Sequence, residues 1–421
     1  MGEWSRNEET NIVRILRCFH ICSGLKINTD KSNLYGVGVG MTEIKDMANV
    51  IGCKPESPPF KYLGLTVGAN MNRVNSWKPV IETFRARLAN WKSHLLSIGG
   101  RVVIIKFVME CLPSYYFSLY KAPKTVIGEL ESMIKKFFWG GSLEEKKMHW
   151  VAWDRVARHK KNGDLGLNKL LNVNISLLSK WGWRFKTEKN GLWKRVIVAI
   201  HSSRVGWECI PFKKAIGGVW CNIVKIFTHT KVSSDMDRWI WLSESDGSFS
   251  VKAVKRLLKK DDSQEDCFIM DWCSWVPAKV NIHAWRMEMD KIPSVEALKK
   301  RNVNIGNSSC PVCQTEDETT EHLFITCHVA SVVWNGISAW CKIPNIFAFS
   351  LKDLLVTYKD LRVSDKKKDA IQSIIMIVCW CLWCARNLAL FSNSPVRIDS
   401  IVSEVKALGF LWFANRSKHI M

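Results

Sequence analysis

The stretch CPVCQTEDETTEHLFITC, residues 310–327, gathers three cysteines and one histidine in a short segment. Cys310 and Cys313 flank a Pro-Val turn, and His322 and Cys327 complete the spacing C-x2-C-x8-H-x4-C. Three thiolates and an imidazole at this spacing are a complete tetrahedral ligand set for zinc. Four protein ligands leave no coordination position for water or substrate. The spacing therefore predicts a Zn²⁺ ion that organises the fold and does not catalyse.

A second interpretation of these four residues is three buried cysteines and a surface histidine that share no metal. The compact spacing of four ligands favours the zinc site, because it is far more specific than a lone CxxC pair. His322 and Cys327 are five residues apart, about 140° out of phase on an α-helix. We therefore expect one of them at a helix end or in a turn.

Length and charge narrow the class of protein. A chain of 421 residues with 47% hydrophobic residues is long enough for two or three globular domains. Lys and Arg outnumber Asp and Glu by 61 to 39, which gives a net charge of +22. An excess of this size suggests RNA or DNA as a partner, bound without sequence specificity. A basic protein whose charge serves only solubility is the alternative.

Cysteine usage and hydropathy bear on the compartment. Fifteen cysteines, and a beginning that does not read as a signal peptide, favour an intracellular, reducing compartment, with nucleus and cytoplasm both open. The longest apolar run, residues 374–385, is shorter than the roughly 20 residues that span a bilayer, so we expect a buried helix and no membrane. Its Cys379, Cys381 and Cys384 are expected to be core thiols and not a second metal cluster.

Hydrophobic periodicity predicts a mainly α-helical chain with a small α+β remnant at its N-terminus. The first residues mix a helix over 7–20 with strand-like runs at 34–39 and 62–68. A helix follows whose apolar stripe consists of Trp77, Ile81, Phe84, Leu88, Trp91 and Leu95. Gly99-Gly100 is the expected stop of that helix. A second helix from Arg101 to Pro113 and a third over 125–139 complete a helical bundle. The third helix has Ile127, Leu130, Ile134 and Phe137 on one side.

Residues 137–186 interleave aromatic and basic side chains. Tryptophan can stack on bases while cations follow phosphates, although most individual tryptophans are expected to belong to the core. The candidate nucleic-acid-binding residues are Arg85, Arg87 and Lys92 in the bundle, Lys146, Lys147, Lys160, Lys161, Lys180 and Arg184 in this segment, and Lys299, Lys300 and Arg301 further on. The last three lie at the predicted C-terminus of a helix capped by Ser294. They could equally serve only the helix dipole.

Several stretches, in order, resemble the C-terminal part of a plant LINE-type (non-LTR) retrotransposon reverse transcriptase. GEWSRNEETNIVRILRCFHICSGLKINTDKSNLYGVGV resembles the end of the palm, FKYLGLTVG the next strand, and RLANWKSHLLSIGGRVVIIKFVMECLPSYYFSLYKAP the thumb helices. WVPAKVNIHAWRMEMDKIPSVEALKKRNV with CPVC, EHLF and Cys327 resembles the reverse-transcriptase zinc-binding domain. WCLWCARNLALF resembles a Trp, Trp, Arg-Asn, Phe pattern that often follows that domain.

The resemblance implies five parts. These are a truncated palm-like remnant over 1–72, a thumb-like helical bundle over 73–140, a basic and aromatic connecting region over 141–235, a zinc-stabilised helical domain over 236–345 and a C-terminal helical region over 346–421. The family's GGLG motif is replaced by GDLG at 163–166. If that glycine needs a positive φ, Asp164 would be strained in its place.

The resemblance also implies what the chain does. Polymerisation in this family uses palm aspartates that hold two Mg²⁺ ions, and the chain begins just past the place where they would lie. Asp261-Asp262 lies in a polar, lysine-flanked stretch without strand character. We therefore expect no catalytic residues, and a derivative that is not an enzyme on its own but keeps structural zinc and nucleic-acid binding. The alternative is a zinc-stabilised scaffold for protein interactions.

Overall fold

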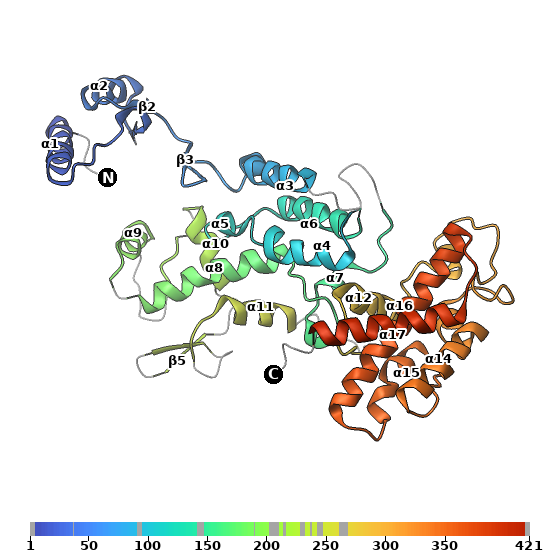
Figure 1. The fold of residues 1–421 in the computed structure, drawn as a ribbon. Helices are drawn as coiled ribbons and strands as arrows, with labels where there is room; N and C mark the ends of the chain where they lie inside the picture. Colours follow the sequence, from blue (N-terminus) through green and yellow to red (C-terminus); the bar gives the residue numbers. More distant parts are fainter. Residues whose placement is uncertain are drawn as a thin grey trace. The chain divides into compact units, whose positions relative to one another are not determined.

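The computed structural model describes residues 5–416, except positions 37, 91–94, 141–146, 189, 202–209, 214–215, 228–231, 236–237, 242–246 and 261–267. The chain is mainly α-helical, as the periodicity predicts (Figure 1). It divides into two compact units, Met1–Pro79 and Val80–Met421. The finer boundaries within them stay a prediction.

The first unit is a small α+β arrangement. Its elements are α1 (Arg6–Ser23), η1 (Thr29–Lys31), β1 (Asn33–Tyr35), α2 (Met41–Ile51), β2 (Lys54–Glu56), β3 (Phe60–Tyr62), β4 (Leu65–Val67) and η2 (Val74–Trp77). Strands β1 and β2 pair in parallel, and β3 and β4 form an antiparallel hairpin. The run at 62–68 is therefore not one strand. Leu63 and Gly64 both have positive φ, at 47° and 82°, which turns the chain back between β3 and β4.

The second unit begins with the predicted bundle. Its elements are α3 (Lys78–Asn90), α4 (Ile98–Ile104), the π-turn η4 (Ile105–Met109), α5 (Ser114–Phe117) and α6 (Lys124–Phe138). The α6 stripe of Ile127, Leu130, Ile134 and Phe137 is buried, and so are Ile81, Phe84 and Leu88 of α3. These parts of the predicted stripes are confirmed. The prediction that Leu95 is buried in this stripe is wrong, because 72% of its surface is exposed. Trp91 lies outside the described residues.

The predicted helix stop at Gly99-Gly100 is also wrong. Ser97 caps α4 by accepting a hydrogen bond from the Gly100 N–H, so both glycines lie in the first turn of a helix. A Cβ atom added to Gly99 would lie 2.9 Å from Cβ of Ala278 and 3.1 Å from the Lys279 nitrogen. Gly99 is therefore required because α4 passes close to the start of another helix, and not because a helix ends there.

The connecting region centres on a long helix, α8. Its elements are α7 (Trp153–Ala157), η5 (Lys160–Asn162), α8 (Leu170–Thr187), α9 (Leu192–His201), α10 (Val219–Phe227), the β5 (Val232–Asp235) and β6 (Arg238–Trp241) hairpin, and α11 (Val251–Lys260). Helix α8 packs against α5, α10 and α11. Trp181 packs on the cluster around Leu178 and Phe185, and Trp183 stacks on Phe249. Both tryptophans therefore pack against the protein, as expected for most of them.

The motif at 163–166 avoids the strain expected of Asp164. The left-handed conformation falls on Gly163 and Gly166, with φ of 80° and 71°. Asp164 is buried, accepts a hydrogen bond from the Trp285 indole at 3.0 Å and lies 3.5 Å from the Arg155 guanidinium. The carboxylate at this position is thus paired with partners that a glycine could not use.

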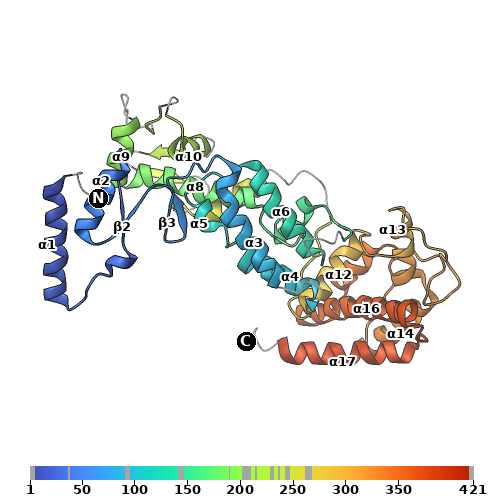
Figure 2. The same cartoon turned by 90° about the horizontal axis from the view of Figure 1, so that it is seen from above.

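The C-terminal half of the second unit is helical. Its elements are α12 (Ala278–Glu288), α13 (Val295–Lys299), the π-turn η6 (His322–Thr326), α14 (His328–Cys341), α15 (Leu351–Val356), η7 (Thr357–Asp360), α16 (Asp365–Ser392) and α17 (Ile398–Arg416). Helix α16 is central, because it contacts α12, α14, α15 and α17, and α17 lies alongside it (Figure 2).

Helix α16 is longer than the apolar run that predicted it. By length and composition alone its 28 residues could cross a membrane, but half of its most apolar window is buried inside the protein. Cys379 and Cys381 are fully buried in it and Cys384 is partly buried, as expected for core thiols. Because four helices pack around α16, we interpret it as the core helix of this region.

The close approach of α4 and α12 can be tested at the two adjacent glycines. We expect Gly99→Val to lower the free energy of unfolding by about 1–3 kcal/mol, because its side chain would overlap Ala278. Gly100→Ala is the matched control, since its Cβ would meet nothing closer than 3.6 Å, and it should change stability by less than about 1 kcal/mol. Urea unfolding followed by circular dichroism measures both; equal effects would contradict the packing.

Candidate metal centre

The four predicted ligands converge. Cys310, Cys313, His322 and Cys327 place one ligand atom each within 4.8 Å of all the others. Cys310, His322 and Cys327 are buried, and Cys313 is partly buried. Sulfur atoms bound to one tetrahedral zinc at about 2.3 Å lie roughly 3.8 Å apart, so the cluster is close to the size that the ion requires.

The first two cysteines lie on a tight knuckle. The Gln314 N–H donates to the Cys310 carbonyl at 2.8 Å, and the Cys310 N–H donates to the Glu316 carbonyl at 2.7 Å. Gln314 adopts the left-handed conformation, with φ of 61°, and an antiparallel bridge joins Ser309 to Asp317. This backbone closure turns the short CPVC sequence so that both thiols face the same point.

A π-turn brings the other two ligands together. In η6 the Cys327 N–H donates to the His322 carbonyl at 2.8 Å, a bond five residues long. Cys327 then ends η6 and is the residue that precedes α14. The expectation that one of these ligands sits at a helix end is confirmed, and the π-turn removes the phase difference of a regular α-helix.

Hydrogen bonds set the tautomer of His322. Its Nε2 lies 3.3 Å from the Cys313 sulfur, on the side of the other ligands. Its Nδ1 lies 2.9 Å from the Glu316 carboxylate and 3.2 Å from the Thr326 hydroxyl. A proton on Nδ1 is held by the carboxylate, which leaves the Nε2 lone pair for a metal.

The thiols are arranged to carry negative charge. A hydrogen bond from Cys310 lowers the pKa of Cys327 and raises that of Cys310, as expected when two close thiols share one proton. Burial opposes the charge on Cys327, while the backbone N–H groups of Val329 and Ala330, in the first turn of α14, favour it. Only a cation between them would allow all three sulfur atoms to be thiolates at once.

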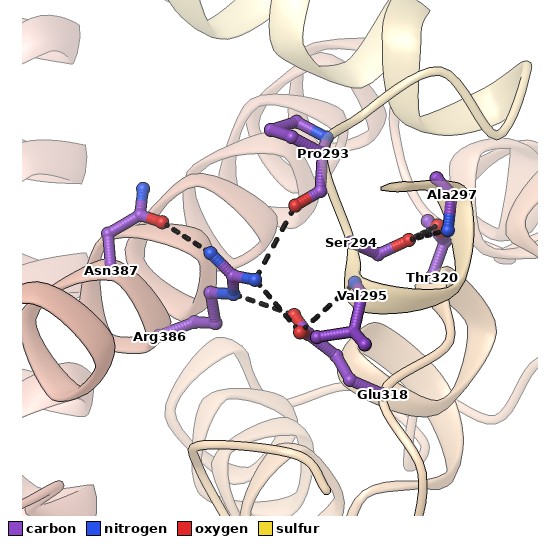
Figure 3. A network of polar contacts seen from close by, with 8 residues as sticks. All are labelled: Pro293, Ser294, Val295, Ala297, Glu318, Thr320, Arg386 and Asn387. Carbon is purple, nitrogen blue, oxygen red and sulfur yellow. Dashed lines mark hydrogen bonds and ion pairs between the residues drawn. The ribbon is translucent and has the colours of Figure 1, made fainter. Parts of the chain in front are cut away.

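A buried ion pair holds the loop between the ligands. Arg386 of α16 donates from Nε and Nη2 to the two carboxylate oxygens of Glu318, at 2.6 and 2.8 Å, and both residues are almost completely buried (Figure 3). Glu318 also accepts from the Val295 N–H at 3.3 Å, at the start of α13, while Arg386 donates to the Pro293 carbonyl at 3.4 Å. The pair connects the zinc loop, α13 and α16.

The sequence did not reveal this pair. Arg386 belongs to the Arg-Asn pattern of the C-terminal region, but nothing local indicates its partner 68 residues away. The predicted Ser294 cap is confirmed, since its hydroxyl accepts from the Ala297 N–H at 3.3 Å. Thr320 contacts the Ser294 hydroxyl, which ties the cap to the same loop (Figure 3). Thr320 also donates to Asp290.

Four of the cations proposed for nucleic-acid binding have partners within the protein. Arg85 pairs with Glu129 at 2.6 Å, and Arg184 pairs with Glu188 at 2.8 Å. Lys300 pairs with Glu296, and Arg301 donates to the His149 and Trp150 carbonyls. These four side chains therefore have intramolecular roles, whatever else they bind.

The remaining candidate cations differ in exposure and surroundings. Arg87, Lys147, Lys160, Lys180 and Lys299 are exposed. Lys160 lies over the Trp272 ring at 5.2 Å, and Lys299 lies at the end of α13, as predicted. Lys92, Lys146 and the side chain of Lys161 lie outside the described residues, as do Asp261 and Asp262. Their predicted roles stay predictions.

The segment that contains the metal centre is similar to a known protein family. Residues 249–334 match the family described as zinc-binding in reverse transcriptase. All four ligands fall within that match, so this region is a zinc-binding domain with a cluster able to hold the ion. The zinc ligands predicted from the spacing therefore agree with both the family and the geometry.

Two proteins of Arabidopsis thaliana are similar to this chain. One, named "Putative ribonuclease H protein At1g65750", is 23% identical over 407 residues, which cover 76% of this chain and 65% of that protein. The other, "Uncharacterized mitochondrial protein AtMg00310", is 30% identical over 87 residues, which cover 20% of this chain and 56% of that protein. The chain thus spans less than two thirds of either relative. Together with the domain match, these similarities support a retroelement origin.

Loss of one ligand should release the metal. We expect Cys313→Ser to lose about one equivalent of zinc and to unfold the 310–327 loop locally, because structural zinc contributes about 10 kcal/mol or more to such modules. Cys381→Ser is the control, since Cys381 is buried in α16 away from the cluster and should keep its zinc. Elemental analysis measures both; equal zinc in Cys313→Ser and the parent would rule out the site.

Loss of one partner in the buried ion pair should be costly. We expect Arg386→Met to lower the free energy of unfolding by about 3–5 kcal/mol, because it leaves the Glu318 carboxylate buried without its counter-charge. Adding Glu318→Leu to that variant should restore part of the lost free energy of unfolding. If the two residues acted independently, the effects of the two substitutions would instead sum.

The exposed Arg85–Glu129 pair provides the control for that experiment. Arg85→Gln should cost less than about 1 kcal/mol, because surface ion pairs are weak. Urea unfolding of the parent and the three variants is the measurement. A small effect of Arg386→Met, close to that of Arg85→Gln, would show that the pair does not hold the zinc loop.

Proposed function

We propose that this chain is a derivative of a LINE-type (non-LTR) retrotransposon reverse transcriptase that holds RNA or DNA without sequence specificity. The observation that carries the proposal is the agreement between the family match over 249–334 and a complete Cys3His cluster. The net charge of +22 supports a phosphate-rich partner. The palm-like and thumb-like resemblance of the preceding stretches supports the LINE assignment.

The zinc in this proposal is structural. Four protein ligands close its coordination shell, so the ion cross-links the knuckle and α14 and offers no site to a substrate. We propose that residues 1–421 bind nucleic acid without extending it, as a truncated form would. We do not propose ribonuclease H activity, which is named for one relative, because the match covers only 65% of that protein.

The cysteine ligands also indicate the cellular compartment in which the protein would work. Three of the four ligands are cysteines, and they bind zinc only when reduced. Most of the other described cysteines are likewise free thiols. We therefore propose a reducing, intracellular location for the functional protein.

Salt dependence tests nucleic-acid binding. We expect the zinc-loaded protein to bind a fluorescent single-stranded RNA of about 20 nucleotides, with an affinity that falls steeply from about 50 to 200 mM salt. Replacing Lys160, Lys180 and Lys299 together by Gln should reduce the slope of log K against log salt by roughly 2, which is about 0.7 for each lost phosphate contact. Fluorescence anisotropy measures both.

A matched charge change provides the control. Lys342, Lys352 and Lys366 are also exposed, and replacing these three by Gln removes the same charge from positions not assigned to binding. We expect that variant to keep the parent slope. Binding that does not respond to salt, or is absent, would favour the alternative of a protein-interaction scaffold.

A further inference from the structure

A cavity of about 530 Å³ lies beside the zinc domain, between the start of α4, helix α12, the 147–150 segment and α16. Four cations line it: Arg101 of α4, Lys147, and Lys279 and Arg286 of α12. Among the described residues that line it there is no carboxylate. The described walls of the cavity therefore present four cations with no acidic side chain among them. Its size is within the roughly 300–1,000 Å³ of ordinary small-molecule sites.

Indole rings alternate with these cations. The Arg286 guanidinium lies 5.6 Å from the centres of both the Trp139 and Trp150 rings. Lys279 lies 5.0 Å from the centre of Trp380, which also lines the cavity. Flat aromatic faces beside cations are the combination that binds a base and its phosphate together.

Two side chains in the cavity wall, those of the partly buried Arg286 and the buried His283, have buried polar atoms without partners. The Nη2 of Arg286 and both ring nitrogens of His283 are buried and make no hydrogen bond, although His283 is only 6% exposed. Buried polar groups are almost always hydrogen-bonded, so each such atom indicates a missing partner. The unsatisfied groups lie on one face of α12, one turn apart, and both residues line the same cavity.

The charge states of these two residues restrict what that partner is. Burial, and then the nearby Arg286, lower the pKa of His283 to about 3, so its imidazole is neutral and offers one N–H donor and one acceptor. Burial, and then Arg301 and Arg101, lower the pKa of Arg286 to about 10, which still leaves it charged at neutral pH. An anion relieves the crowding of these guanidinium groups. A phosphodiester group has no hydrogen-bond donor for the histidine, whereas the edge of a base can both donate and accept.

The wall is held in place by contacts that do not use these free atoms. Arg286 is anchored through Nε to the Lys291 carbonyl at 3.0 Å, and Arg101 donates to the carbonyls of Leu96 and Phe138. His283 packs against Phe324, a residue of η6 between two zinc ligands. The zinc domain thus supports one wall of the cavity.

We propose that this cavity binds one nucleotide, a nucleoside monophosphate unit of a single strand, with its phosphate at Arg286 and Arg101 and its base against the indole rings. The inference rests on the proposed function, since it names the nucleic-acid group that the zinc domain would receive. Inorganic phosphate would leave the indole rings without a partner. A neutral aromatic molecule would leave the cations unpaired.

Isothermal titration of the zinc-loaded full chain with AMP tests the proposal. We expect one AMP per chain, with inorganic phosphate and adenosine each binding at least about tenfold more weakly, because each supplies only half of the contacts. Arg286→Gln should weaken AMP binding by roughly tenfold or more. Arg286→Lys, which keeps the charge, should lose less.

Two variants separate binding from folding. Lys406→Gln is the control, because Lys406 also lies over a tryptophan ring, 5.8 Å from the centre of Trp340, but is outside the cavity, and this variant should bind AMP as the parent does. Lys147→Glu reverses an exposed charge at the cavity and should weaken AMP binding without loss of zinc. Zinc content and circular dichroism confirm that each variant is folded.

The outcomes distinguish the pocket from the proposed function. If the parent binds the RNA in a salt-dependent way but does not bind AMP, or binds phosphate as well as AMP, the nucleotide pocket is wrong and the proposed function stands. If AMP binds as expected and the RNA does not, the pocket stands and the proposed function is wrong. Equal AMP affinities for folded Arg286→Gln, Lys147→Glu and Lys406→Gln would also overturn the pocket.

Discussion

The buried pair of Arg386 and Glu318 joins the zinc loop to the central helix α16. Both oxygens of the carboxylate receive a guanidinium N–H, and a backbone N–H at the start of α13 adds a third bond. A buried charge is tolerated only when it is paired and hydrogen-bonded in this way. Because Glu318 lies between the second and third zinc ligands, the pair fixes the loop whose ends the metal fixes.

The metal constrains the zinc loop internally, and the ion pair constrains the position of that loop against α16. Zinc sets the distances among a knuckle, a π-turn and the N-terminus of α14, all within a short stretch of chain. The ion pair sets where that stretch lies against α16, a helix of 28 residues that packs on α12, α14, α15 and α17. The local knot and the larger helical core are therefore held to each other by this ion pair and by the packing of α14 and η6 on α16.

This arrangement lets a structural metal support the proposed nucleotide pocket without contacting its ligand. Phe324 of the π-turn packs on His283, and Pro293 both accepts from Arg386 and lines the cavity beside α12. The cavity thus takes one wall from the zinc domain and others from α4 and α16. Its cations and indoles come from segments that meet only when those helices are packed.

The sequence by itself determined the features that depend on neighbouring residues. The spacing of Cys310, Cys313, His322 and Cys327 identified the ligand set, because zinc coordination is satisfied within one short loop. The periodicity of the α6 side chains predicted a buried helical face, since a stripe at this spacing can be read in one segment. The Ser294 cap was equally local.

Only the tertiary structure decided the contacts between distant segments. It made Gly99 a point of close approach to Ala278, gave Asp164 a partner in Trp285, and gave Arg386 its partner in Glu318. It also assigned intramolecular roles to cations such as Arg301 that the sequence had proposed for nucleic acid. The physical reason is that burial and charge pairing depend on which helices pack together, and residue spacing within one segment carries no information about that.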